Sequence, residues 1–182
     1  YQNVLLVMAS YVFYGWWDWR FLFLIIFSTL LDFYAGQQIY KQIHRPKKAR
    51  YWLWLSMAGN IGVLGFFKYY NFFVDSFVDL FANFGYEMNS TWTLRIILPV
   101  GISFYTFQTM SYSFDIYYKK LKPTKNFIAF AAFVAFFPQL VAGPIERASN
   151  LLKQINSKRT FKYQQASSGL KLILWGFFKK LV

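Results

Sequence analysis

Residues 21–39 read FLFLIIFSTLLDFYAGQQI, a near-continuous run of Leu, Ile and Phe that contains a single acidic residue, Asp32. An α-helix needs about twenty predominantly apolar residues to cross the hydrocarbon core of a bilayer. The stretch therefore predicts a transmembrane helix. It also makes the other apolar segments of the chain candidates for membrane helices.

The composition supports a membrane protein. The chain of 182 residues is 57% hydrophobic and 24% aromatic, and only 15% of its residues are charged. This is too much apolar surface for a chain of this length to expose to water. Since cysteine is absent, disulfides and thiolate metal sites are excluded. We expect an all-α fold, a polytopic transmembrane helical bundle with a re-entrant segment and cytoplasmic surface helices.

The positive charge lies in short clusters between the apolar segments. KQIHRPKKAR at 41–50 and KKLKPTK at 119–125 contribute many of the twenty basic residues behind the net charge of +13. Such clusters are typical of loops held at an anionic leaflet, so they favour a membrane over nucleic acid as partner. Both loops are predicted to be cytoplasmic.

Further segments extend the predicted bundle. Residues 4–14 are too short to span and precede GWWDWR, an aromatic cluster typical of the membrane interface. Residues 51–67 predict a second span that ends at Lys68, and its glycines would allow close approach of a neighbouring helix; they are Gly59, Gly62 and Gly65. Residues 72–84 carry Asp75 and Asp79, which favours an interfacial or partly buried helix.

In the C-terminal half, the positions of the basic residues conflict with a simple count of membrane crossings. Residues 127–142 have nearly spanning length, but basic segments flank them on both sides. A re-entrant hairpin, broken near its end by Pro138, Gly143 and Pro144, would keep both flanks cytoplasmic. Residues 148–165 suit a cytoplasmic surface helix, and residues 167–182 begin another membrane helix. The count is five or six membrane-embedded segments in one domain, 1–182.

One predicted helix carries polar groups at bilayer depth. Residues 98–118 read LPVGISFYTFQTMSYSFDIYY, in which polar and aromatic positions alternate at spacings of four and three and share one helical face: Gly101, Tyr105, Gln108, Tyr112 and Asp115. That face must look inward, because a carboxylate facing lipid is costly. It could line a substrate passage or form a packing seam, and both interpretations stay open.

FPQLVAGPIER, residues 137–147, combines a helix break with Gln139 at depth and with Glu146 and Arg147 at the membrane boundary. A substrate-gating loop and a helix end with paired charges both fit, and local chemistry favours the helix end. The single histidine, His44, lies in a basic loop without an acidic partner nearby in the sequence, so we do not expect it to be catalytic. The scattered carboxylates form no metal-ligand spacing.

Three blocks resemble the membrane-bound O-acyltransferase family, within it the branch of the alginate O-acetyltransferase membrane subunit. They are LPVGISFYTFQTMSYSFDIYY, FVAFFPQLVAGPIERASNLLKQI and GLKLILWGFFKKLV. FYGWWDWRFLFLIIFSTLLDFYAG and LGFFKYYNFF are similar to that branch too, so the likeness covers nearly the whole chain.

The resemblance implies a multi-pass enzyme of the bacterial inner membrane that moves an acyl group, most simply acetyl, to hydroxyls of an exported polysaccharide. Acetyl-CoA or another acyl carrier would be the cytoplasmic donor, no cofactor would stay bound, and a partner acetyltransferase subunit could relay the group. The family's catalytic histidine lies downstream of the matched blocks, so no catalytic residue is expected here. The chain would be the N-terminal part of a larger enzyme and inactive alone.

The resemblance also implies a tunnel through tilted helices. The residues expected along it are Tyr105, Gln108, Tyr112 and Asp115, with Gln139, Glu146 and Arg147 at its cytoplasmic mouth. Within the same chemistry, D-alanyl transfer to teichoic acid and acetylation of peptidoglycan are alternatives. A transporter or flippase subunit would also use broken helices and polar groups at the midplane, although no inverted repeat is visible. A purely structural membrane subunit is the last alternative.

Overall fold

The computed structural model describes residues 1–84, 99, 101–143 and 146–181, and all regular structure in these residues is helical. The all-α prediction is confirmed. The helices are α1 (Gln2–Asp18), α2 (Arg20–Lys41), α3 (Pro46–Asn83), α4 (Ile102–Tyr117), α5 (Phe127–Val134), α6 (Phe137–Ala142), α7 (Ala148–Asn156) and α8 (Tyr163–Leu181).

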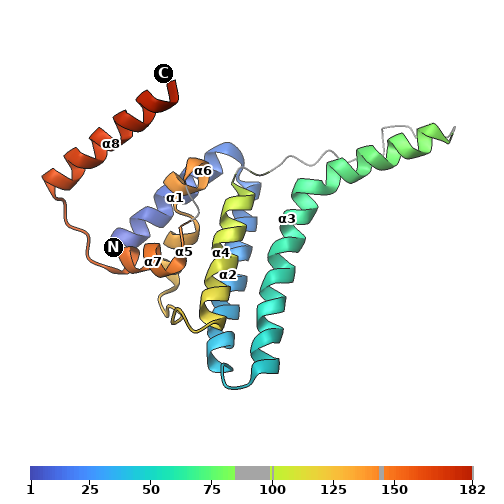
Figure 1. Ribbon diagram of the computed structural model, residues 1–182, viewed down its shortest axis with the longest axis horizontal. Helices are drawn as coiled ribbons and strands as arrows, with labels where there is room; N and C mark the ends of the chain where they lie inside the picture. The colour runs from blue at the N-terminus through green and yellow to red at the C-terminus, as the bar shows by residue number, and fades with distance from the viewer. Residues whose placement is uncertain (85–98, 100, 144–145, 182) are drawn as a thin grey trace.

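Three helices form the centre of the fold. Figure 1 shows α2, α4 and the first part of α3 running side by side, and each of the three contacts the other two. α2 covers the predicted span at 21–39 and is the one helix among the described residues that is long and apolar enough to cross a membrane. The multi-pass arrangement therefore stays a prediction.

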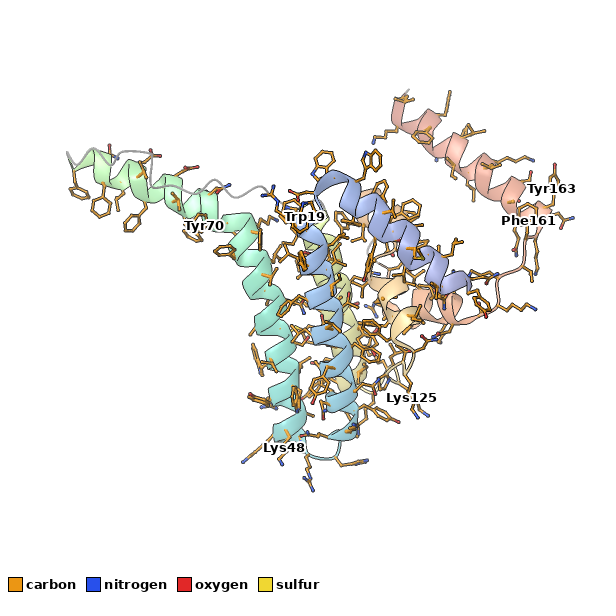
Figure 2. All side chains as sticks on the ribbon, turned by 180° about the vertical axis from the view of Figure 1, so that it is seen from behind. Trp19, Lys48, Tyr70, Lys125, Phe161 and Tyr163 are labelled. Atoms are coloured by element: carbon orange, nitrogen blue, oxygen red, sulfur yellow. The ribbon has the colours of Figure 1, made fainter. Side chains whose placement is uncertain are left out.

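α3 corrects the prediction of two separate segments at 51–67 and 72–84. Residues 46–83 form one continuous helix of 38 residues, so Lys68 does not end it. The helix bends near Tyr70, and its second part leaves the central helices (Figures 1 and 2). The scattered charges Asp75 and Asp79 do not interrupt the backbone, because helical hydrogen bonding needs no continuous apolar surface.

Close approach of the central helices depends on glycine at two positions. A methyl group at Gly36 of α2 would lie 2.7 Å from the Tyr112 ring of α4, and one at Gly59 of α3 would meet the end of the Leu31 side chain. Gly62 and Gly65 face open space. The predicted close contact at the glycine series is therefore confirmed at Gly59 alone.

The two basic loops lie at one end of the bundle. In Figure 2, Lys48 at the start of α3 and Lys125 before α5 are at the same end, whereas Trp19 lies at the other. This placement agrees with the prediction that both loops are on one side of a membrane.

Between α1 and α2, the Arg20 guanidinium hydrogen-bonds the Asp18 carboxylate at 2.9 Å, and this bond lowers the pKa of Asp18.

Residues 127–142 fold as two short helices. α5 contacts α1, α2, α4 and α7, and all residues from Ala129 to Ala135 are buried. The helix breaks at Ala135–Phe136, ahead of Pro138, which occupies the first turn of α6; the predicted break near the end of the segment is thus too late. A re-entrant position in a bilayer remains a prediction.

The predicted surface helix at 148–165 is shorter than expected. α7 ends at Asn156, where the Ser157 amide donates to the Lys153 and Gln154 carbonyls, and a non-helical segment leads to α8. The buried positions of α7, Ala148, Leu152 and Ile155, share one face. α8 stands away from the other helices, and none of its residues is buried (Figure 1).

The outer surfaces of the bundle are apolar. Phe23 and Phe27 of α2, Trp54 and Ile61 of α3 and Phe107 of α4 are all exposed. Exposed apolar area on this scale marks an interaction surface, and hydrocarbon is the solvent that such a surface suits. Polar groups, by contrast, gather in the interior.

Candidate functional site

The polar face predicted on α4 does look inward. Tyr105, Gln108, Tyr112 and Asp115 are all buried, while Phe107 and Phe114 on the opposite side are exposed. Gly101 precedes the helix with φ of 75°, a left-handed conformation that glycine adopts without strain. The helical spacing in the sequence thus identified the inward face correctly.

Two residues of this face make contacts between helices and loops. The Gln108 side-chain amide donates to the Phe133 carbonyl of α5 at 2.8 Å. The Tyr112 hydroxyl accepts from the Thr124 amide at 3.3 Å, and its ring lies 4.6 Å from that of Phe130. The structure therefore brings Gln108 and Tyr112 against α5 and its preceding loop, which is where a packing seam would place them.

A second polar group lies on the adjacent side of α4, between α2 and α3. We call it the Asp32 cluster, and its members are Ser28, Asp32, Ser56, Asn60, Thr109 and Ser113. Asp32 is 0% exposed, and its carboxylate accepts hydrogen bonds from the Ser56 hydroxyl, from the Asn60 amide at 2.7 Å and from the Ser113 hydroxyl at 3.3 Å. The remaining Asn60 oxygen accepts from the Ser28 hydroxyl at 2.6 Å.

The polar hydrogens of the cluster all have acceptors within it or on the adjacent backbone. Each hydroxyl donates once, and the two amide protons of Asn60 go to Asp32 and to the Ser56 carbonyl. Three donors on one carboxylate offset part of the cost of its burial. The cluster thus ties together three helices, and its position identifies it as a structural element of the bundle.

Sequence reasoning noted Asp32 only as an interruption of an apolar run. Its partners lie 24 to 81 positions away along the chain, so no local pattern could reveal them. A usable signal was present in α3, where Ser56 and Asn60 are four positions apart in an otherwise apolar stretch. Polar residues at this spacing lie on one helical face, and their partners must come from a neighbouring helix.

Two tyrosines form a different kind of group at the junction of α1, α4 and α6. Tyr14 and Tyr105 are buried, and neither hydroxyl has a hydrogen-bond partner among the described residues. We call them the tyrosine pair. Ser10, one turn before Tyr14 on α1, also has a buried hydroxyl without a partner there.

The Tyr14 hydroxyl and the Leu140 carbonyl converge on Gly101. A methyl group added at Gly101 would lie 2.6 Å from the Tyr14 oxygen and 3.0 Å from the Leu140 oxygen. The Leu140 carbonyl belongs to the last turn of α6, and the residue four positions later is Pro144, which has no amide hydrogen to donate. The Tyr14 hydroxyl and the Leu140 carbonyl thus both lie against the start of α4.

An apolar groove of ≈ 760 Å³ reaches the same junction. It is lined by one face of α1, including Phe13, Tyr14 and Trp16, and by Phe137 of α6. The Phe13 and Phe137 rings lie 5.3 Å apart. Because its lining is almost entirely apolar, the groove suits the alkyl part of a small ligand better than a sugar, whose many hydroxyls would all need partners.

The residues predicted at the tunnel mouth differ in their exposure to solvent. Gln139 is buried on α6, Glu146 is partly buried, and Arg147 is exposed. The Glu146 carboxylate accepts from the Asn150 amide of α7 at 3.0 Å, across one helical turn. Glu146 is thus bonded to a neutral side chain, and neither it nor Arg147 forms an ion pair among the described residues.

The described residues provide no metal centre, since no group of three His, Asp or Glu side chains comes together among them. His44 lies in the turn between α2 and α3, within the basic loop at residues 41–50. Asp115, buried at the last turn of α4, accepts the Lys120 and Leu121 amides through its carbonyl.

An all-helical chain with an apolar outer surface and buried polar groups belongs to the class of helical membrane proteins. Comparison with known proteins then gives its relatives. No family model and no solved structure matches the chain. The probable alginate O-acetylase AlgI of Pseudomonas putida is 41% identical over 181 residues, and that of Pseudomonas aeruginosa is 42% identical over 181 residues. The peptidoglycan O-acetyltransferase of Helicobacter pylori is 32% identical over 208 residues.

Each of these matches covers 100% of the chain but 34% to 38% of the relative. The chain thus spans little more than a third of the length of the curated relatives that it matches. The resemblance inferred from the sequence blocks is confirmed: over its whole length the chain is similar to proteins named alginate O-acetylase and to a peptidoglycan O-acetyltransferase.

Proposed function

We propose that the protein is part of an O-acyltransferase that transfers an acetyl group to hydroxyls of a polysaccharide outside the inner membrane of a bacterium. The observation that carries this proposal is the similarity of the whole chain to proteins named as O-acetylases of two different glycans, alginate and peptidoglycan. What these relatives share by name is the acetyl group and the glycan acceptor. Both names favour acyl transfer over transport.

In the proposed reaction, the bond between the acyl carbon and its donor breaks and an ester bond to the glycan oxygen forms. The proton of the glycan hydroxyl passes to the leaving group of the donor. The donor is acetyl-CoA or another acyl carrier on the side of the basic loops, and a partner acetyltransferase subunit can receive the group on the opposite side. Positioning of the two reactants supplies much of the acceleration in such a step.

Within this reaction, the chain forms part of the wall of the passage through which the acyl group moves. The apolar groove supports this role, because it can hold the methyl part of an acyl group next to Tyr14. A rearrangement of Tyr14 and Tyr105 would bring their buried hydroxyls to the acyl oxygen, which can accept two hydrogen bonds. Asp115 and Gln108 are further proposed lining residues, with Gln139, Glu146 and Arg147 towards the cytoplasmic mouth. The Asp32 cluster lies on the other side of α4 and is assigned no contact with substrate.

Alanine substitutions test the lining residues in the protein expressed from its complete gene. Acetyl ester formation on the glycan is measured for Gln108→Ala and Asp115→Ala at matched membrane expression, with Ser111→Ala on the same helix as control. Transfer that falls at least tenfold in the two variants and not in the control supports the assignment. Unchanged transfer in both removes Gln108 and Asp115 from the passage.

Analysis of the product separates the proposed reaction from its alternatives. Acetyl ester on an exported glycan supports the proposal, whereas D-alanyl ester on teichoic acid would show that a related reaction occurs instead. A wild-type protein that forms no acyl ester with any donor but moves a lipid or solute across the membrane would contradict the proposal altogether.

A further inference from the structure

A basic pocket lies between α7 and the segment that leads to α8, away from the tyrosine pair. Its volume is ≈ 350 Å³. Its floor is apolar and comes from Phe136, at the break between α5 and α6, and from Leu151 and Ile155 of α7. Its wall is polar, and it includes Ser157 and Thr160.

The charges around this pocket have one sign. Lys158, Arg159 and Lys162 line it, and none of the residues that line it is acidic. The single salt bridge found among the described residues joins Asp18 and Arg20, so none of the three cations is in an ion pair there. Three positive charges around a small space attract an anion with more than one negative charge.

The backbone of the pocket is held in place on both sides. The Gln2 side chain of α1 donates to the Arg159 carbonyl at 3.0 Å and accepts from the Arg159 amide at 3.4 Å. The Arg159 guanidinium also donates to the Asn3 side chain. On the other side, the Ser157 hydroxyl donates to the Gln154 carbonyl at the end of α7. Because Asn3 is neutral, the charge of Arg159 remains available to a ligand.

We propose that this pocket binds a phosphate-bearing anion through Lys158, Arg159 and Lys162. Arg and Lys together suit phosphate, since a guanidinium donates two parallel hydrogen bonds and an ammonium adds a compact charge. The apolar floor places a less polar part of the same ligand next to Phe136. The phosphate comes either from a soluble ligand with a pyrophosphate group or from the head group of an anionic lipid.

The test measures ligand binding and does not depend on acyl transfer, so it can fail or succeed independently of the proposed function. Lys158, Arg159 and Lys162 are replaced together by Gln in the protein expressed from its complete gene. The matched control replaces Lys119, Lys120 and Lys122 by Gln, which removes the same charge from another exposed basic loop. Calorimetry in zwitterionic nanodiscs measures the affinity for inorganic pyrophosphate and for coenzyme A. Native mass spectrometry measures retention of phosphatidylglycerol over phosphatidylcholine.

The proposal predicts a loss of affinity of at least tenfold in the pocket variant and a change of no more than about twofold in the control. Pyrophosphate binding that shows this pattern identifies a soluble ligand, and retention of phosphatidylglycerol with this pattern identifies a lipid. An equal loss in both variants, or binding of neither probe by the wild-type protein, overturns the proposal. Tighter binding of an oligouronate than of pyrophosphate overturns it as well, because the site would then prefer carboxylates.

Discussion

The two buried sides of α4 differ in whether their polar groups have hydrogen-bond partners. Towards α2 and α3, Thr109 and Ser113 join a cluster in which the Asp32 carboxylate accepts hydrogen bonds from three side chains. Towards α1 and α6, the hydroxyls of Tyr105 and Tyr14 both lack a partner among the described residues. The same helix thus carries one satisfied polar network and one unsatisfied group.

This difference distinguishes polar groups that stabilise helix packing from polar groups that are candidates for ligand binding. An unsatisfied buried hydroxyl costs about 1–3 kcal/mol, so we expect these two hydroxyls to gain a partner such as water or a ligand in the working protein. A satisfied network needs no further group and stabilises the helices that contribute to it. The side of α4 that faces α2 and α3 has one exception. There, the buried Thr106 hydroxyl also has no partner among the described residues.

Removal of the Asp32 carboxylate should produce the largest effect. Asp32→Ala leaves the Ser56 and Ser113 hydroxyls and the Asn60 amide without their acceptor, and we expect a loss of about 3–5 kcal/mol in the free energy of unfolding. Unfolding of the purified protein by a denaturing detergent measures the loss. Ser111→Ala, on the same α4 helix but outside the cluster, provides the control. Wild-type stability in Asp32→Ala would contradict the structural role of the cluster.

A methyl group at Gly36 tests how closely α2 and α4 approach. Gly36→Ala places a carbon 2.7 Å from the Tyr112 ring, which cannot move without disturbing α5. We expect the protein to lose about 1–3 kcal/mol of stability through overpacking. Gly62→Ala is the matched control, because nothing lies within 4 Å of the added methyl group and alanine favours a helix. Equal stability of the two variants would show that α2 and α4 do not pack as described.

Loss of the Gln108 hydrogen bond should have a smaller effect on stability. Gln108→Leu keeps the size of the side chain but leaves the Phe133 carbonyl without the amide that donates to it at 2.8 Å. We expect a decrease of about 1 kcal/mol. Gln108→Glu is the comparison, because its carboxylate cannot donate while ionised and should cost more. A leucine variant as stable as wild type would show that the bond between α4 and α5 is not needed for folding.

The tyrosine pair should show the smallest change in stability. Tyr14→Phe and Tyr105→Phe each remove a hydroxyl without a partner, so the free energy of unfolding should stay unchanged or rise by about 1 kcal/mol. Acetyl transfer should fall about tenfold, which corresponds to about 1.4 kcal/mol for one lost hydrogen bond to the acyl group. Tyr11→Phe and Tyr117→Phe, on the same helices, are the controls. Transfer at the wild-type rate in all four variants would remove the pair from the reaction.

Much of this fold could be predicted from periodicity. The span around Asp32 and the inward face of α4 were both visible, because apolar length and a repeat of three and four residues are local properties of a chain. The continuation of α3 past Lys68 was missed, since charged residues on an exposed helix lower its hydrophobicity without breaking its backbone. The break between α5 and α6 precedes Pro138, because proline lacks an amide and tolerates only the first turn of a helix.

The candidate site could be predicted only in part. Tyr105 was identified from its helical face, whereas Tyr14 was not, because nothing within α1 marks which of its tyrosines meets another helix. The partners of Asp32 come from helices that are distant in the sequence, so their convergence depends on tertiary packing. Whether a buried hydroxyl has a partner is likewise a property of the folded chain.

The contrast between the two sides of α4 can be measured directly with one substitution on each. Ser113→Ala and Tyr105→Phe each remove one hydroxyl from the same helix, and both unfolding stability and the rate of acetyl transfer per folded molecule are determined. The account predicts that Ser113→Ala lowers stability by about 1 kcal/mol and leaves transfer intact, while Tyr105→Phe lowers transfer and leaves stability intact. The reverse pattern, or equal changes in both quantities, would contradict it.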